Sequence, residues 1–197
     1  MNAKAIGLIA IFTALTIALS QFRIPTPYPP GFTYKLFQIP IVVAFLFLGP
    51  RYGVTIAFLN MIAIEAISGA ETAFLGPLYA LLITLTMLLG VYISSKYFAH
   101  KTGSSEGNFD AKPAALSTAI GVISRALLLL PVDYVFLSTV WSVASGMSIT
   151  EANAYVITIM PGIILFNITV PLYVIPVSYY ITKKLSKSFK IGKQAIG

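Results

Sequence analysis

Residues 75–95 read LGPLYALLITLTMLLGVYISS, a run of 21 residues without one charged side chain. A helix needs about 20 mostly apolar residues to cross the hydrocarbon core of a bilayer. Charged groups are kept out of that core because burying one there is costly. The run therefore predicts a transmembrane helix.

The composition extends this prediction to the whole chain of 197 residues, of which 57% are hydrophobic and 10% are charged. Soluble domains carry about 25% charged residues, and disordered chains are poor in apolar ones, so both classes are excluded. We predict an all-α, polytopic membrane protein with six transmembrane helices and no separate soluble domain. The single membrane domain covers residues 1–197, with spans at about 5–22, 34–48, 52–68, 75–95, 114–140 and 153–182.

The first and last predicted spans each have an unusual feature. Residues 5–22 follow Lys4, as the apolar part of a signal peptide would, but the run is long for that role and no small-residue cleavage site precedes Arg23. Residues 153–182 contain three prolines and exceed the length of one span. We therefore expect the last helix to be tilted or kinked.

Three polar or proline-rich stretches are predicted to be connections. Residues 23–33, RIPTPYPPGFT, hold four prolines and one glycine and cannot form a regular helix. Their aromatic residues Tyr28 and Phe32 are placed to fold over a site. Residues 96–113, KYFAHKTGSSEGNFDAKP, are strongly polar, and residues 141–152 are mixed.

The basic residues predict the orientation, because inner loops of membrane proteins carry an excess of Lys and Arg. With both termini inside, ten basic residues lie on the inner side and only Arg23 and Lys35 on the outer side. The ten are Lys4, Arg51, Lys96, Lys101, Lys112, Lys183, Lys184, Lys187, Lys190 and Lys193. The net charge of +7 then reflects topology and contact with anionic membrane lipid, and we expect no nucleic-acid partner.

Several kinds of chemistry are excluded by residue type. The chain has no Cys and one His, which excludes disulfides, thiolate metal sites and multi-histidine metal sites. Phosphate-binding loops, the Gly-x-Ser-x-Gly motif and the His-Glu-x-x-His motif are absent from the sequence. We expect no catalytic residue, no metal and no cofactor, and any active transport must take its energy from a partner.

Arg125 is the main candidate for a functional group, since it lies midway along the fifth predicted span. Exposing it to lipid would cost about 2.5–3.5 kcal/mol, so it is predicted to face the bundle interior. One interpretation is a ligand contact, because a guanidinium suits carboxylates, carbonyls and phosphates. The other is a structural pair with Glu65 or Asp133.

Other polar groups inside the spans also need partners when they are buried. Asn60, Glu65, Asp133 and Asn167 are of this kind. For the asparagines, ligand contact competes with hydrogen bonding between helices, which is common in membranes. Aromatic residues near the outer boundary fit an interfacial belt or stacking on a planar ligand; they are Tyr28, Tyr34, Trp141 and Tyr155.

Small residues recur at four-residue spacing in the first span, at Ala10, Ala14 and Ala18, with Gly7 offset by three. This spacing places the alanines on nearly one helix face and permits close approach of another helix. The stripe serves either packing within this bundle or docking of a second protein.

Four stretches together resemble the substrate-binding S components of energy-coupling factor (ECF) vitamin transporters, most closely the riboflavin type. FTYKLFQIP (32–40) is similar to the entry of the second helix, and GPRYGVTIAFLN (49–60) to a Gly-Pro-x-x-Gly turn and helix. ISRALLLLPVDY (123–134) resembles an arginine-bearing fifth helix, and MPGIILFNITVP (160–171) a sixth-helix Phe-Asn stretch. Gln38, Asp133 and Val170 depart from the riboflavin-type pattern.

The resemblance implies a capture subunit for a small water-soluble vitamin, riboflavin-like, in the plasma membrane. It implies a transmembrane coupling subunit, docked on Ala10, Ala14 and Ala18, and two cytoplasmic ATPases as partners. Our candidate substrate-binding residues are Lys35, Gln38, Asn60, Glu65, Tyr79, Arg125, Asp133, Tyr134 and Asn167. The alternative functions are a stand-alone facilitator or secondary transporter, which needs a polar stripe along several helices, and a membrane enzyme acting on lipids.

Overall fold

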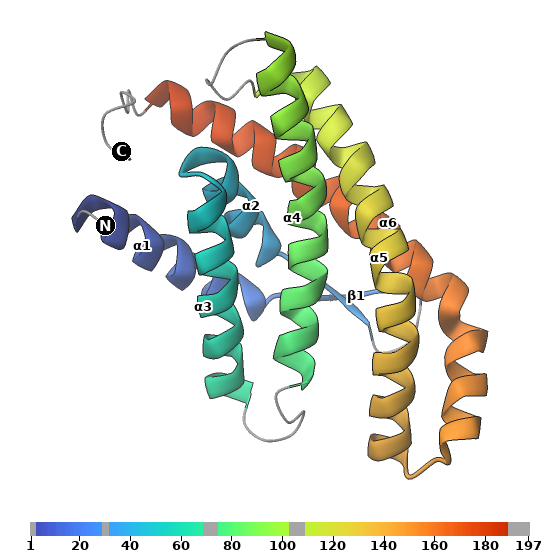
Figure 1. The fold of residues 1–197 in the computed structure, drawn as a ribbon. Coiled ribbons are helices and arrows are strands. Elements are labelled where there is room, and N and C mark those ends of the chain that lie inside the picture. Colours follow the sequence, from blue (N-terminus) through green and yellow to red (C-terminus); the bar gives the residue numbers. More distant parts are fainter. Residues whose placement is uncertain (1–2, 29–31, 69–74, 103–108, 189–197) are drawn as a thin grey trace.

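The computed structural model describes residues 3–28, 32–68, 75–102 and 109–188, which form six helices and one small sheet (Figure 1). In chain order the elements are α1 (Ala3–Ser20), β1 (Arg23–Pro25), β2 (Thr33–Lys35), α2 (Gln38–Phe47), α3 (Pro50–Ser68), α4 (Leu75–Thr102), α5 (Ala111–Ser145) and α6 (Ile149–Ser188). A bundle of six helices in the predicted order is thus confirmed.

Among the described residues, four helices are long and apolar enough to cross a membrane, namely α1, α4, α5 and α6. The predicted span 34–48 is wrong in its bounds, because α2 has only 10 residues. At about 1.5 Å per residue it is about 15 Å long, which is half of the roughly 30 Å hydrocarbon core. The shortening follows from β2, which takes the residues before α2 into a strand.

The short helix α2 forms the centre of the bundle, in contact with α1, α3, α4 and α6. Its residues 40–45 are all buried, as expected of a helix that is apolar on every side. Pro40 lies in the first turn, where the backbone N–H groups have no intrahelical partner, so the proline does not disturb the helix.

The proline-rich connection, predicted to be a loop, contains a two-stranded antiparallel sheet in an otherwise helical fold. β1 pairs with β2, with Arg23 opposite Lys35 and Ile24 opposite Tyr34. Proline excludes a regular helix here but is tolerated at a strand edge. The hairpin joins α1 to α2 and, through Tyr34, packs against α6.

Both predicted polar loops are shorter in the structure. The helix α4 continues to Thr102, because residues 96–102 contain neither Gly nor Pro to stop it. The helix α5 ends at Ser145 and is capped by Gly146, whose φ of 64° is left-handed. A capping box then starts α6: the Ser148 N–H donates to Glu151 Oε2 at 2.9 Å, and the Glu151 N–H donates to Ser148 Oγ at 3.3 Å.

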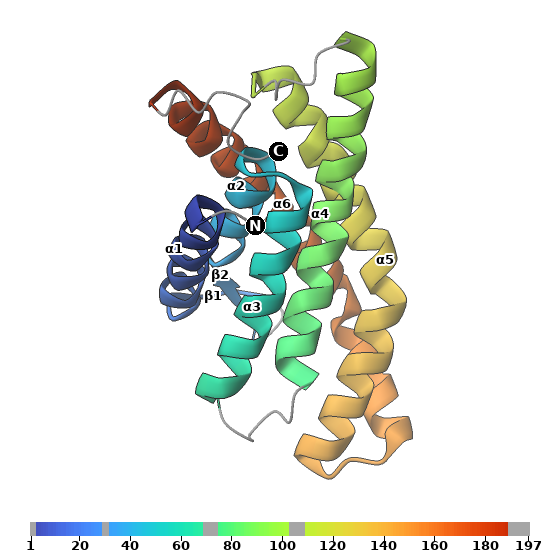
Figure 2. The same ribbon diagram turned by 60° about the vertical axis from the view of Figure 1, so that its left-hand side comes forward.

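Figure 2 shows α1, α3, α4 and α5 in that order across the molecule, in agreement with their contacts. The long helix α6 contains Pro161, Pro171 and Pro176 and changes direction along its length (Figure 1). Interior prolines remove a backbone hydrogen bond and bend a helix, so the predicted kinking is confirmed. In Figure 1 the α2–α3 connection and the C-terminal end of α4 lie at the upper end, whereas the α5–α6 connection lies at the lower end.

Candidate functional site

Arg125 occupies the centre of a buried hydrogen-bond network and is 1% exposed. Its Nε donates to Asn167 Oδ1 at 3.3 Å, and its Nη1 donates to Gln38 Oε1 at 3.2 Å. Gln38 in turn donates from Nε2 to the hydroxyl of Thr84 at 3.1 Å. The chain of bonds connects α2, α4, α5 and α6, so it fixes these four helices relative to one another.

Asp133 closes the other end of the same network. Asn167 Nδ2 donates to Asp133 Oδ2 at 2.5 Å, and the Tyr79 hydroxyl donates to Asp133 Oδ1 at 2.6 Å. Asn167 therefore bridges the arginine and the aspartate. Direct pairing of Arg125 with Glu65 or Asp133 is not seen, since the ion pair found among the described residues joins Lys183 and Asp110.

The indirect link follows from helix geometry. Arg125 and Asp133 are eight residues apart on one helix, which corresponds to a rise of about 12 Å, too far for a direct contact. Asn167, on the neighbouring helix α6, carries both an acceptor and a donor and hydrogen-bonds to both side chains.

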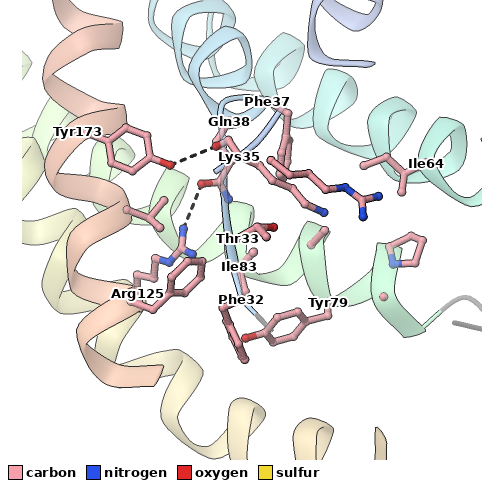
Figure 3. A pocket seen from close by; sticks show the side chains of 16 residues that line it. Phe32, Thr33, Lys35, Phe37, Gln38, Ile64, Tyr79, Ile83, Arg125 and Tyr173 are labelled. Atoms are coloured by element: carbon pink, nitrogen blue, oxygen red, sulfur yellow. Dashed lines mark hydrogen bonds between the residues drawn. The ribbon is translucent and has the colours of Figure 1, made fainter. Parts of the chain in front are cut away.

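A cavity of about 530 Å³ lies in front of this network, between the hairpin and helices α2–α6. Its volume is within the range of about 300–1,000 Å³ that is typical of small-molecule sites. Its polar and charged lining residues are Arg23, Thr33, Lys35, Gln38, Tyr79, Arg125 and Tyr173, and its other lining residues are Phe32, Phe37, Ile64, Gly76, Pro77, Ala80, Ile83, Phe166 and Val170. Figure 3 shows Lys35, Gln38 and Arg125 around the same space.

The cavity lies near one end of the bundle. The helix α4 contributes residues 76–83, its first two turns, and α3 contributes Ile64, in its last two turns. The lysines at residues 96, 112, 183, 184 and 187 lie near the opposite ends of the helices, namely the last turns of α4 and α6 and the first turn of α5. Under the predicted orientation, the cavity is therefore on the outer side.

Aromatic side chains tie the hairpin to α6 at the cavity. The ring of Phe166 packs edge-on against Phe32, with centroids 5.2 Å apart, and stacks against Tyr34 at 5.3 Å. The Tyr34 hydroxyl lies 2.9 Å from Thr169 Oγ1, and the Tyr173 hydroxyl donates to the Lys35 carbonyl at 3.2 Å. Of the two loop aromatics predicted to fold over a site, Phe32 lines this cavity.

The charged groups of the cavity are all basic: within the described residues, Arg23, Lys35 and Arg125 line it, and no carboxylate does. Burial lowers the pKa of Lys35 from its ordinary value, and the neighbouring positive charge of Arg23 lowers that pKa further. Both causes disfavour a second positive charge at this place.

Of the predicted substrate-binding residues, Lys35, Gln38, Tyr79 and Arg125 line the cavity. Two others, Asp133 and Asn167, support it from behind through the network. The remaining three, Asn60, Glu65 and Tyr134, are not among the lining residues.

Asn60 is buried and its Oδ1 has no hydrogen-bond partner within the described chain, nor has Glu65 Oε2. Tyr134 is half-buried and packs against a small apolar cluster around Leu137 and Val156. The structure does not bring these three residues to the cavity wall.

Arg23, Phe166 and Tyr173 also line the cavity, although they were not predicted from the sequence. For α6 a signal was available, since Phe166, Val170 and Tyr173 follow the i, i+4, i+7 spacing of one helix face. For Arg23 no sequence signal existed, because its place depends on the register that sets it opposite Lys35.

The small-residue stripe of α1 faces away from the bundle. Ala10, Ala14 and Ala18 are exposed, and a Cβ added to Gly7 would meet nothing within 4 Å. The face of α1 that packs inward carries Ile9, Phe12 and Thr16 instead. Of the other aromatic candidates, the Trp141 side chain lies outside the described residues, and Tyr28 and Tyr155 are half-buried away from the cavity wall.

Comparison with known proteins finds a match in structure and none in sequence. No family model matches this sequence, and no curated protein is significantly similar to it. Among solved structures, the fold is similar to that of the S component of a bacterial ECF transporter, with a TM-score of 0.73 and 20% sequence identity. The alignment covers 94% of this chain and 96% of the other, so the two share one fold over nearly their whole length.

Proposed function

We propose that this chain is the substrate-capture S component of an ECF-type importer for a small water-soluble vitamin. The observation that carries the proposal is the cavity lined by Arg125, Gln38 and Lys35 at the end of the bundle opposite its lysine-rich end. The fold shared with an S component along 94% of the chain supports it.

Capture in this proposal occurs from outside, under the β1–β2 hairpin. The aromatic contacts of Phe32 and Tyr34 with α6 hold the hairpin against the cavity. A ligand there would stack on the aromatic wall, while Arg125 and Gln38 bond its polar atoms. We propose a riboflavin-like ring system as the ligand, since five aromatic residues line the cavity: Phe32, Phe37, Tyr79, Phe166 and Tyr173.

Release requires partners in this proposal. A transmembrane coupling subunit would dock on the exposed face of α1 around Ala10, Ala14 and Ala18, where small side chains permit close helix approach. Two cytoplasmic ATPases would supply the energy that tips the capture subunit in the membrane and opens the cavity inward.

The facilitator alternative needs a polar path from the cavity to the other side of the membrane. Beyond Gln38, the helix α2 continues with Ile41, Val42 and Ala44, which are fully buried and apolar. Buried apolar packing below the cavity favours a closed binding site over a channel.

Native mass spectrometry of the purified chain tests the proposal. We expect a small molecule to co-purify with the wild-type protein in a one-to-one complex, and the chain to join a coupling subunit and two ATPases when these are co-expressed. An empty protein that assembles with no coupling module would contradict it.

A further inference from the structure

The cavity carries three positive charges and, within the described chain, no negative one on its wall. Lys35 is half-buried and Arg23 is exposed, whereas Arg125 is fully buried. A buried charge is costly unless an opposite charge or good hydrogen bonds compensate it. Arg125 has such compensation in Gln38, Asn167 and, through Asn167, Asp133. For Lys35 and Arg23 the described residues supply no ion pair.

The hairpin register makes this pair of cations unfavourable as it stands. Arg23 and Lys35 are directly opposite each other across the β1–β2 ladder. Side chains at such positions are neighbours, with Cβ atoms about 4.5–5.5 Å apart, and like charges there are destabilising. The lowered pKa of Lys35, caused by burial and by Arg23, agrees with this geometry. An anion between the two side chains would remove the repulsion.

Arg125 offers a second polar anchor deeper in the same cavity. A guanidinium has five N–H donors, and its hydrogen bonds within the described chain start from Nε and Nη1. Donors therefore remain for a carbonyl, carboxylate or phosphate oxygen of a ligand. Aromatic residues, among them Phe32 and Tyr173, fill the wall between these anchors.

From this arrangement we infer that the captured molecule is an aromatic organic anion, whose carboxylate or phosphate lies between Arg23 and Lys35 while its ring stacks on the aromatic wall. The inference rests on the proposed function and adds an acidic group to the class of substrate. A neutral vitamin would leave the repulsion between Arg23 and Lys35 in place.

Matched pairs of probes that differ only in the acidic group test the inference. Riboflavin 5′-phosphate is compared with riboflavin, and pyridine-3-carboxylate with pyridine-3-carboxamide, by calorimetric titration of the chain in phosphatidylcholine nanodiscs, which exclude anionic lipid. We expect the anion to bind at least about tenfold more tightly than its neutral partner in one pair, as one charge-assisted hydrogen bond would give. The pair that responds identifies the acid as phosphate or carboxylate.

Two variants locate the anion. In Lys35→Gln and in Arg23→Gln the ratio of anion affinity to neutral-partner affinity should fall below about threefold. Lys35→Gln keeps the backbone carbonyl that accepts the Tyr173 hydrogen bond, so the hairpin remains attached. Lys112→Gln, an exposed lysine in the first turn of α5, is the control and should keep the full preference.

The outcomes separate this inference from the proposed function. Equal or tighter binding of the neutral partners, or an anion preference that both hairpin variants retain, overturns the charge assignment and leaves the capture function standing. Failure of all four probes to bind the wild-type chain, together with failure to assemble with a coupling subunit, overturns both.

Discussion

At the scale of single residues, the burial of Arg125 is the feature that most needs a physical account. The residue is 1% exposed, and its guanidinium bonds to Gln38 and Asn167. An ion taken out of water without compensation costs several kcal/mol, so these neutral acceptors and the more distant Asp133 must offset that cost. The same side chain also lines the cavity. Arg125 is therefore both a structural link and a candidate ligand contact.

The substitution Arg125→Met separates these two roles, because it keeps most of the side-chain length but removes the charge and the donors. We expect a folded protein of lower stability that binds its ligand roughly ten- to a hundredfold more weakly, since a lost bond to a charged group is worth about 1.5–3 kcal/mol. Melting temperature and dissociation constant are measured on the same preparation.

Asn167→Leu is the matched control for that experiment, because Asn167 supports Arg125 and Asp133 from behind and does not line the cavity. It should lower the melting temperature while changing affinity by about 1 kcal/mol or less. A loss of stability with unchanged affinity in Arg125→Met would end the assignment of Arg125 as a ligand contact.

At the scale of helices, close backbone contact holds α4 against α5. A Cβ added to Gly90 would lie 2.5 Å from Gly121 Cα and 2.7 Å from Ser124 Oγ. No side chain fits at that crossing, so the absence of a Cβ lets the two helices approach. The two helices held together at this crossing contribute Tyr79, Ile83 and Arg125 to the cavity.

Gly90→Ala should destabilise the isolated chain by about 1–3 kcal/mol, because overpacking forces neighbouring atoms apart. Gly7→Ala makes the same chemical change on α1, where the added Cβ meets nothing within 4 Å. It should be neutral or slightly stabilising, because Ala favours a helix by about 1 kcal/mol over Gly. Equal unfolding free energies for the two variants would refute the crossing as a close contact.

The exposed face of α1 gives a second prediction at the scale of helices. Ala14→Leu should prevent assembly with the coupling subunit and leave ligand affinity unchanged, because leucine separates two closely packed helices. Ala115→Leu, at an exposed alanine of α5, is the control and should assemble normally. If Ala14→Leu co-purifies with the coupling subunit as well as the wild type does, the stripe is not the docking surface.

At the scale of the whole molecule, the predicted topology places the lysine-rich helix ends inside and the cavity outside. The sequence was sufficient for the six helices and for the burial of Arg125 inside the bundle, because apolar runs and isolated in-span polar residues are local signals. Gln38 was reached only through the family resemblance. The sequence was not sufficient for the hairpin, since the pairing of Arg23 with Lys35 depends on tertiary register. Nor did it separate Asp133 and Asn167, which support the cavity, from the residues that line it.

Removal of residues 188–197 tests the topology. Residues 189–197 lie outside the described chain, and the tail begins at the lysine-rich end of α6. We expect the truncated protein to bind its ligand with wild-type affinity, as measured by calorimetric titration. A large loss of affinity would place the tail near the cavity and would overturn the assigned orientation.

The most direct test of the central claim, that a ligand occupies the cavity in front of Arg125, is to fill that cavity. Ile83 of α4 lines it, whereas Ile93 of the same helix is 46% exposed on the outer surface of the bundle. The dissociation constant of the co-purifying molecule is measured for Ile83→Trp and Ile93→Trp. We predict that Ile83→Trp weakens binding by at least about a hundredfold, the equivalent of about 2.8 kcal/mol, and that Ile93→Trp leaves it unchanged. Wild-type affinity in a folded Ile83→Trp protein would contradict the claim.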